Sequence, residues 1–212
     1  MNDGHLKKVS IALGIASWLL AVVVGFSLLL RYQFQPGQAA QAHAQWPGSS
    51  LIALSPKRPT LIVVAHPKCP CSSASIDELA RLMANCQGKV EAYVLFMLPS
   101  EERGRTTLSK EEWQNTPLRR QAQAISGVTV LSDPNGQEGD RFGVATSGNA
   151  LLYAPDGRLL FAGGLTGSRG HSGDNAGREA LESWILNHQG PQESPVYGCA
   201  MHSGEETCQT KP

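Results

Sequence analysis

The protein has 212 residues, and 18 lysines and arginines balance 18 aspartates and glutamates. A formal net charge of zero provides no long-range field to attract nucleic acid or an anionic lipid surface, so we exclude both as charge-driven partners. Hydrophobic residues make up 41% of the chain, an ordinary globular value that argues against a disordered chain or a multi-span membrane protein. The charged fraction is only 17%, because Arg31 is the one charged residue between Lys8 and Lys57.

The amino-terminal region contains one long apolar run, residues 9–30 (VSIALGIASWLLAVVVGFSLLL). As a helix it would be about 33 Å long, enough to cross a bilayer core of about 30 Å. A cleaved signal peptide is the alternative, because residues 40–42 and 42–44 both read Ala-x-Ala, like a cleavage site. The apolar part of a signal peptide spans roughly 7–15 residues. The longer run therefore favours an uncleaved transmembrane anchor.

The flanking charges predict the orientation of this anchor. Lys7 and Lys8 precede the run, whereas only Arg31 follows it before Lys57. Basic residues stay preferentially on the cytoplasmic side. We therefore expect residues 1–8 in the cytoplasm and everything after the run outside.

The remaining chain divides by composition into three parts. Residues 31–57 are polar and nearly uncharged, as in a tether without a core of its own, although Trp46 and residues 51–54 are candidates for contact with the folded part. A domain is expected over residues 58–190. The last part, residues 191–212, is a polar tail that contains cysteine and histidine.

Hydrophobic patterning in the domain alternates short apolar runs with amphipathic segments. We expect Ser75 and Glu78 to form a capping box on the first helix, and Asp174 or Asn175 to cap the last. The element order predicts an α/β fold, a mixed β-sheet flanked by helices. The expected strands are 61–65, 90–98, 128–131, 150–154 and 158–162, and the expected helices begin near residue 72 and cover 118–125 and 176–187.

Two cysteines lie where the first strand gives way to the first helix, in His66-Pro67-Lys68-Cys69-Pro70-Cys71-Ser72. Unpaired N–H groups and the positive end of the helix dipole stabilise a thiolate there, and Lys68 adds a positive charge. A thiol of ordinary pKa, about 8.5, is acidified in such a place. The pair could also be a structural crosslink or two inert small side chains, but its position favours a redox or metal-binding role.

This segment resembles the active site of the thioredoxin-like superfamily, in particular its membrane-tethered TlpA-type branch, which carries W-C-P-P-C-R-x-E-x-P-x-L. Cys69 and Pro70 match the first cysteine and its proline, and Leu79 matches the helix position that packs on the sheet. Later landmarks agree: residues 142–144 read Phe-Gly-Val, and an Asp-Gly turn follows at 156–157. The resemblance spans about residues 58–188. The glycine-rich stretch 165–175 is most similar to RedB-type redoxins.

The resemblance implies a thioredoxin-like fold and a thiol–disulfide oxidoreductase or redox sensor without a cofactor. Such a protein would sit in the bacterial inner membrane with its domain in the periplasm, where its partners would be protein thiols and disulfides. Cys69 would be the attacking thiolate and Cys71 the resolving thiol, although another thiol or the partner could also resolve Cys69. Nucleic acid is not an expected partner.

Two departures from the family pattern bear on the chemistry. Ser72 stands where the family has its second cysteine, and Gly148 stands where the family has a cis-proline. A disulfide between Cys69 and Cys71 would be strained, because disulfides need fixed separations and dihedral angles. Losing the cis-proline weakens control over substrate docking and removes a steric guard against metal binding at the thiols.

Three further side chains are candidates to support the site. His66 precedes the thiols as a candidate base or ligand, although a lone histidine is more often a packed residue. Arg169 and His171 lie in the loop before the last helix, which borders the active site in this family. We expect them to steer substrate or to lower a thiol pKa.

The other cysteines leave alternatives open. Cys86 falls on the inner side of the first helix and is expected to be buried and inert. A Cys199–Cys208 disulfide suits an oxidising compartment, and a tail cysteine could instead resolve Cys69 or Cys71.

A metal-binding alternative comes from residues 197–202, which resemble the Y-x-C-P-M-H element of heavy-metal-binding segments. The protein would then carry copper(I) or zinc at Cys69 and Cys71, with His171, or Cys199 and His202, completing the site. A third interpretation, favoured by Ser72 and Gly148, is a catalytically inactive docking module.

Overall fold

The computed structural model describes residues 3–98 and 110–201, in two units that divide after Gln35. The first unit consists of α1 (Asp3–Gln33). Its segment Lys7–Gln33 has a mean hydropathy of 2.4 and no buried share, so by length and composition it can cross a membrane. The apolar helix expected from the sequence is therefore present, and its insertion and orientation stay predictions.

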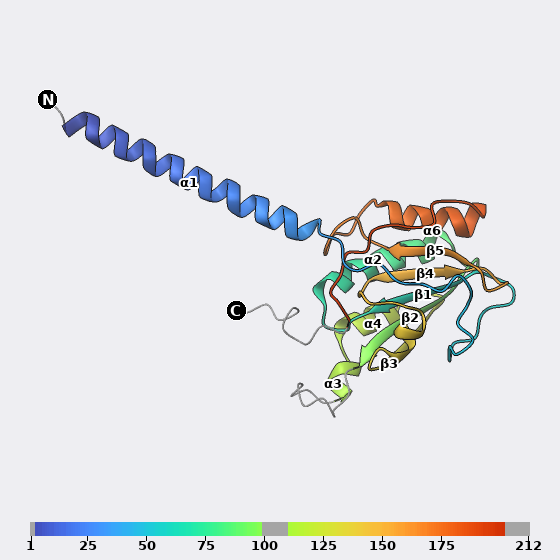
Figure 1. The fold of residues 1–212 in the computed structure, drawn as a ribbon. Helices are drawn as coiled ribbons and strands as arrows, with labels where there is room; N and C mark the ends of the chain where they lie inside the picture. The colour runs from blue at the N-terminus through green and yellow to red at the C-terminus, as the bar shows by residue number, and fades with distance from the viewer. Residues whose placement is uncertain (1–2, 99–109, 202–212) are drawn as a thin grey trace. The chain divides into compact units, whose positions relative to one another are not determined.

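A five-stranded mixed sheet forms the centre of the second unit, in the order β3-β2-β1-β4-β5 (Figure 1). β1, β2 and β3 are parallel, whereas β4 is antiparallel to β1 and β5 is antiparallel to β4. This confirms the predicted mixed sheet. β3 continues past its predicted end because it stays paired with β2, Leu98 opposite Pro134. The strands are β1 (Thr60–Ala65), β2 (Glu91–Leu98), β3 (Val128–Pro134), β4 (Asn149–Tyr153) and β5 (Leu159–Gly164).

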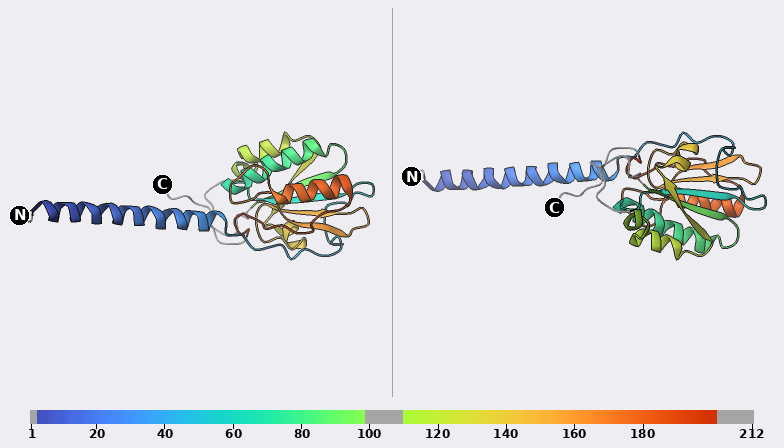
Figure 2. Two further views of the ribbon diagram at one scale, coloured as in Figure 1. Left: turned by 90° about the horizontal axis from the view of Figure 1, so that it is seen from above. Right: turned by 90° about the horizontal axis from the view of Figure 1, so that it is seen from below.

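Helices cover one face of this sheet. Figure 2 shows α2 (Pro70–Asn85) and α4 (Pro117–Gln123) on the same side, and α6 (Ala176–Asn187) contacts both α2 and β5. Their apolar faces form one core with alternate residues of the strands, including Val63, Leu79 and Leu181. The short helices α3 (Lys110–Gln114) and α5 (Gln137–Arg141) were not expected, since five residues are too few to show a helical period.

The caps of the two longer helices differ in how well the sequence indicates them. α2 begins at Pro70 with Cys69 as its N-cap, because proline suits the first helical position. Ser75 is therefore inside the helix, and the predicted capping box with Glu78 is wrong. At α6, Asn175 is the cap, since its Oδ1 accepts a hydrogen bond from the Arg178 N–H at 2.9 Å.

The opposite face of the sheet is covered by α5 and by an irregular segment, residues 36–57, which we call the linker. Trp46 packs edge-on against Phe142 and Tyr153, with ring centroids 5.0 and 5.2 Å apart. Ile52 is 6% exposed in the same cluster, whereas the adjacent Leu51 is 83% exposed. The linker thus lies on the domain and contributes to its core.

Residues 191–201, which we call the strap, also lie on the domain. Their first part runs beside β5, where the Ala162 N–H donates to Gln192 O at 2.9 Å and the Gly164 N–H donates to Ser194 Oγ at 3.0 Å. Further on, Val196 and Met201 are buried. The strap therefore follows the edge of the sheet, and its end packs against the face that the linker covers, where Met201 lies in the same buried cluster as Ile52.

Candidate functional site

Cys69 occupies the junction between β1 and α2. Its backbone is extended, with φ −83° and ψ 120°, and the Ser72 N–H donates to its carbonyl at 3.0 Å to open the helix. The side chain is only 2% exposed. A thiol at this position faces the unpaired N–H groups of the first helical turn.

Three thiols converge at this point. The Sγ atoms of Cys69 and Cys199 are 3.1 Å apart, and those of Cys69, Cys71 and Cys199 all lie within 4.8 Å of one another. Cys71 and Cys199 are partly exposed, and none of the four cysteines in the described part of the chain forms a disulfide. The site therefore holds three sulfur atoms, one of them from a residue 130 positions away from Cys69.

Cys69 and Cys71 differ in their affinity for a proton. Hydrogen bonds from the thiols of Cys199 and then Cys71, together with the backbone N–H groups of Ser72 and Cys71, hold the pKa of Cys69 well below its usual range, against the effect of burial. Hydrogen bonding to Cys199 and Cys69, with burial, raises the pKa of Cys71. Cys69 is therefore the thiolate of the cluster, and Cys71 stays protonated as a donor.

Lys68 and His66 both contact the ring of Trp113. The Lys68 ammonium lies 4.6 Å from the centre of the Trp113 ring, and the His66 ring meets the same indole edge-on at 5.6 Å. His66 Nδ1 accepts from the Lys68 N–H at 3.3 Å. These two side chains shape the turn that carries Cys69, and exposed Pro70 starts the helix after it.

Ser72 links this turn to the segment before β4. Its Oγ is 2.6 Å from Ser147 Oγ, which also accepts from the His66 N–H at 3.0 Å. The next residue, Gly148, has φ +87° and donates its N–H to Val64 O at 2.7 Å. A Cβ at this glycine would come 2.9 Å from Ser75 Oγ. Its hydrogen bond to Ser147 gives Ser72 a positioning role. The described residues contain no cis peptide bond, at Gly148 or elsewhere.

The strap reaches the thiols by pairing with residues 145–147. Ser147 donates its N–H to Cys199 O at 2.9 Å, and Met201 donates its N–H to Ala145 O at 2.8 Å, around an antiparallel bridge between Thr146 and Ala200. These bonds place Cys199 directly over Cys69.

Arg169 and His171 occupy different positions relative to this strap. The guanidinium of Arg169 donates a hydrogen bond to Gly198 O, so Arg169 borders the site. His171 is exposed, and among the described residues only Cys69, Cys71 and Cys199 form a group of converging ligand atoms. The geometry thus brings Arg169 to the strap and leaves His171 outside the thiol cluster.

A buried ion pair holds the glycine-rich loop against α2. Glu78 is fully buried, and its carboxylate accepts from Arg178 Nε at 2.8 Å, Ser172 Oγ at 2.9 Å and the Gly173 N–H at 2.7 Å. The Asn175 amide donates to the same carboxylate at 3.2 Å, and Arg81 Nε lies 3.7 Å from it. Because each lone pair of the buried carboxylate has a donor, this network fixes the loop that carries Arg169.

The other cysteines are placed as follows. Cys86 is fully buried, as predicted, and burial raises the pKa of its thiol to about 11. Cys208 and His202 lie outside the described residues. The Cys199–Cys208 disulfide, and the metal site that includes His202, therefore stay predictions.

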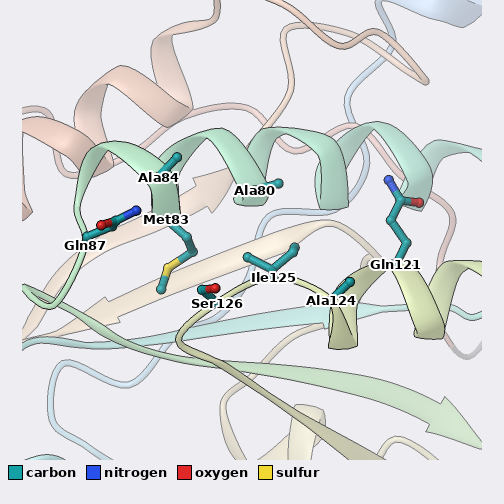
Figure 3. A pocket seen from close by; sticks show the side chains of 8 residues that line it. All are labelled: Ala80, Met83, Ala84, Gln87, Gln121, Ala124, Ile125 and Ser126. Atoms are coloured by element: carbon teal, nitrogen blue, oxygen red, sulfur yellow. The ribbon is translucent and has the colours of Figure 1, made fainter.

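A shallow groove of about 380 Å³ lies elsewhere, between α2 and the end of α4 (Figure 3). Its lining includes Ala80, Met83 and Ile125, and none of its lining residues carries an ionisable group. It offers no chemistry comparable to the thiol cluster.

Ser147 is the site residue that sequence reasoning did not indicate, whereas Cys199 is indicated only as one alternative, a metal ligand beside Cys69 and Cys71 or a tail thiol that resolves one of them. A further signal for Cys199 is the pair of apolar residues, Val196 and Met201, around it in an otherwise polar tail. Ser147 carries no comparable signal, because its role depends on a contact with Ser72.

Comparisons with known proteins bear on the fold. Protein-family models and curated proteins give no match. Among solved structures, an uncharacterized conserved protein from Geobacillus kaustophilus shares 17% identity over 82% of this chain and 95% of that chain, with a TM-score of 0.55. A hypothetical protein from Sinorhizobium meliloti shares 17% identity over 81% and 96%, with a TM-score of 0.56. A secreted disulfide oxidoreductase from Mycobacterium tuberculosis shares 16% over 63% and 84%, with a TM-score of 0.44.

The second unit has the thioredoxin-like fold. The mixed sheet flanked by helices, with the cysteines between the first strand and the first helix, is the arrangement expected from the sequence. The narrower assignment to the TlpA-type branch or to RedB-type redoxins stays a prediction.

Proposed function

We propose that the protein is a membrane-anchored, extracytoplasmic thiol–disulfide oxidoreductase whose nucleophile is Cys69. The observation that carries the proposal is a buried thiol at a helix N-terminus, 3.1 Å from a second thiol. A nucleophilic cysteine needs thiolate character, and a dithiol needs a second sulfur within reach. Both conditions are met at Cys69.

The reaction would be thiol–disulfide exchange with protein partners. The Cys69 thiolate attacks one sulfur of a partner disulfide and forms a mixed disulfide, and the other partner sulfur leaves as a thiolate. A second thiol of the protein then releases the partner. Hydrogen bonds to Cys69 support the thiolate that this first step requires.

Anchoring by α1 would hold the domain at the periplasmic face of the bacterial inner membrane. Support comes from the length and mean hydropathy of Lys7–Gln33 and from the basic residues Lys7 and Lys8 before it. Protease treatment of intact spheroplasts tests the orientation. Digestion of the domain supports it, and full protection overturns it.

Removing the nucleophile tests the proposed activity. The full chain with Cys69→Ser should react with glutathione disulfide at least about 100-fold more slowly than the unchanged protein. Stopped samples are analysed by mass spectrometry for the glutathione adduct and for intramolecular disulfides. Cys208→Ser, which changes a cysteine outside the described site, is the matched control and should keep the rate. Equal rates for Cys69→Ser and the unchanged protein would instead favour an inactive docking module.

A copper(I) or zinc carrier is the second candidate, and the convergence of three sulfur atoms within 4.8 Å favours it. Cys69, Cys71 and Cys199 would hold the ion, because thiolates are the ligands that soft cations prefer. Metal analysis of anaerobically purified protein tests this role. One copper or zinc per chain, lost in Cys199→Ser, supports it, and a metal-free protein with a titratable low-pKa thiol overturns it.

A further inference from the structure

We infer that Cys199 is the thiol that resolves Cys69, and that the strap is a cover over Cys69 that the Cys69–Cys199 disulfide locks in place. The inference rests on the proposed thiol–disulfide exchange. It decides between alternatives that the sequence leaves open, in which Cys71, a tail cysteine or the partner resolves Cys69.

Distance and backbone geometry favour Cys199 over Cys71. The Cys69 and Cys199 sulfurs are 3.1 Å apart, so a bond of about 2.05 Å needs only a small side-chain movement. Cys71 lies in the first turn of α2, beyond a proline whose φ is fixed. The Cys71 thiol also lies within 4.8 Å of Cys69 Sγ and hydrogen-bonds to it, but the two residues flank this proline in one tight turn. Joining them would distort the turn that the Ser72 N–H closes on Cys69 O.

The strap is held at this place by contacts that do not involve the thiols. Backbone hydrogen bonds join Cys199 O to the Ser147 N–H and the Met201 N–H to Ala145 O. Met201 and Val196 are 4% and 2% exposed, so the strap is fixed on both sides of Cys199. The thiol of Cys199 is therefore delivered to Cys69 by backbone pairing and apolar packing.

A close approach at Gly198 makes this placement specific. A Cβ at this residue would lie 1.8 Å from Ser147 O, so the docked strap accepts only glycine here. No left-handed φ is required at Gly198, which means that the constraint comes from the contact alone. A side chain at residue 198 therefore displaces the strap without changing a thiol.

The exchange consists of two successive steps, in each of which one thiolate attacks a disulfide and another thiolate leaves. Cys69 attacks the partner disulfide R–S–S–R′, an S–S bond to R forms, and R′–S⁻ leaves. Cys199, having lost its proton to solvent, then attacks Cys69 Sγ, the Cys69–Cys199 bond forms, and R–S⁻ leaves. Two electrons pass to the partner disulfide, and a partner dithiol returns them in the reverse sequence.

The two redox states then differ in access to the nucleophile. Cys69 is 2% exposed with the strap in place, so a bulky partner reaches it only after the strap lifts. In the reduced protein the strap lifts by breaking hydrogen bonds and apolar contacts, a local opening. In the oxidised protein a covalent bond holds it, so only attack on the disulfide itself opens the site.

Single cysteine variants of the full chain test the resolving role. Each is exposed to glutathione disulfide and digested without reduction, and the peptides are identified by mass. Cys199→Ser should accumulate glutathione on Cys69 at least about tenfold over the unchanged protein, because resolution is lost. Cys71→Ser and Cys208→Ser should instead contain a Cys69–Cys199 disulfide with little adduct.

The outcomes separate this inference from the proposed function. Adduct accumulation in Cys71→Ser but not in Cys199→Ser, or an internal Cys69–Cys71 disulfide in the unchanged protein, overturns the inference and leaves the oxidoreductase proposal standing. If Cys69 acquires neither glutathione nor a disulfide in any variant, the proposed exchange itself fails.

Two glycine-to-alanine variants test whether the strap covers Cys69. In the reduced protein, at a pH high enough to ionise Cys69 with or without the Cys199 hydrogen bond, Gly198→Ala should raise the alkylation rate of Cys69 by about tenfold or more, because the strap can no longer close over it. Gly48→Ala, where a Cβ meets nothing within 4 Å, is the matched control and should leave the rate unchanged. An unchanged alkylation rate in Gly198→Ala would contradict the inference that the strap covers Cys69.

Discussion

The linker and the strap are two irregular segments on the same domain, but one contributes to its core and the other to its candidate site. Both have polar sequences, and both lie on the folded unit rather than apart from it. The linker brings Trp46 and Ile52 to the sheet and completes a core. The strap brings Cys199 to Cys69 and completes a site. Similar composition therefore says little about whether a segment serves stability or chemistry.

The largest effect on stability is expected at a glycine under the linker. Gly143 has φ +70°, and a Cβ there would lie 2.1 Å from Gln41 O. Gly143→Ala should lower the free energy of unfolding by about 3 kcal/mol or more, from backbone strain and from displacement of the linker. Urea unfolding of the full chain measures it.

Gly88→Ala is the matched control for this change. Gly88 also has φ +70°, but a Cβ there meets nothing within 4 Å, so only the strain of about 1 kcal/mol applies. Equal losses in both variants would show that the linker contributes nothing at Gly143.

A neighbouring pair in the linker sharpens the same point with a smaller effect. Ile52 is 6% exposed and Leu51 is 83% exposed. Ile52→Ala should cost about 2–3 kcal/mol, because it leaves a cavity in the cluster on that face, whereas Leu51→Ala should cost less than about 0.5 kcal/mol. Thermal unfolding of the two variants compares them directly, and similar melting temperatures would contradict the docked linker.

A change in the strap is expected to have a small effect on stability and a large effect on the pKa of Cys69. Cys199→Ala should change the unfolding free energy of the reduced protein by under about 1 kcal/mol, because Cys199 is partly exposed. It should raise the pKa of Cys69, since the hydrogen bond from Cys199 is the first cause of the low value.

The pH dependence of iodoacetamide alkylation at Cys69 measures this shift. Fewer donors make the thiolate less stable, so the midpoint of the rate profile must move to higher pH in Cys199→Ala. Cys86 serves as an internal reference, because its thiol, with a pKa of about 11, stays protonated at neutral pH. An unmoved midpoint would mean that Cys199 does not stabilise the thiolate.

Much of the fold could be predicted from the sequence because its signals are local. Continuous apolar runs such as residues 61–65 indicate buried strands, and the helical period in α2 and α6 indicates the face that packs on them. The predicted start of α2, near residue 72, lies within two residues of the observed one, but Ser75 and Glu78 imitate a cap that the helix does not use. Glu78 instead pairs with Arg178, a contact between distant residues that no local pattern encodes.

The candidate site could be predicted only in part, because it too depends on contacts between distant residues. Cys69 and Cys71 were indicated by their place between a strand and a helix. Cys199 could be named only as one alternative among several, because its position depends on backbone pairing with residues 145–147 and on a glycine contact at Ser147. Chemistry assembled from distant segments appears only once the chain is folded.

The first part of the strap has a further consequence, for solubility. β5 is the last strand of the sheet, and its outer side would offer unpaired N–H and C=O groups to another chain. The bond from the Ala162 N–H to Gln192 O and those between Gly164 and Ser194 Oγ occupy that side. A chain ending at Gly190 would therefore have an open edge strand, and we expect it to aggregate through edge-to-edge pairing even with Cys69 and Cys71 intact.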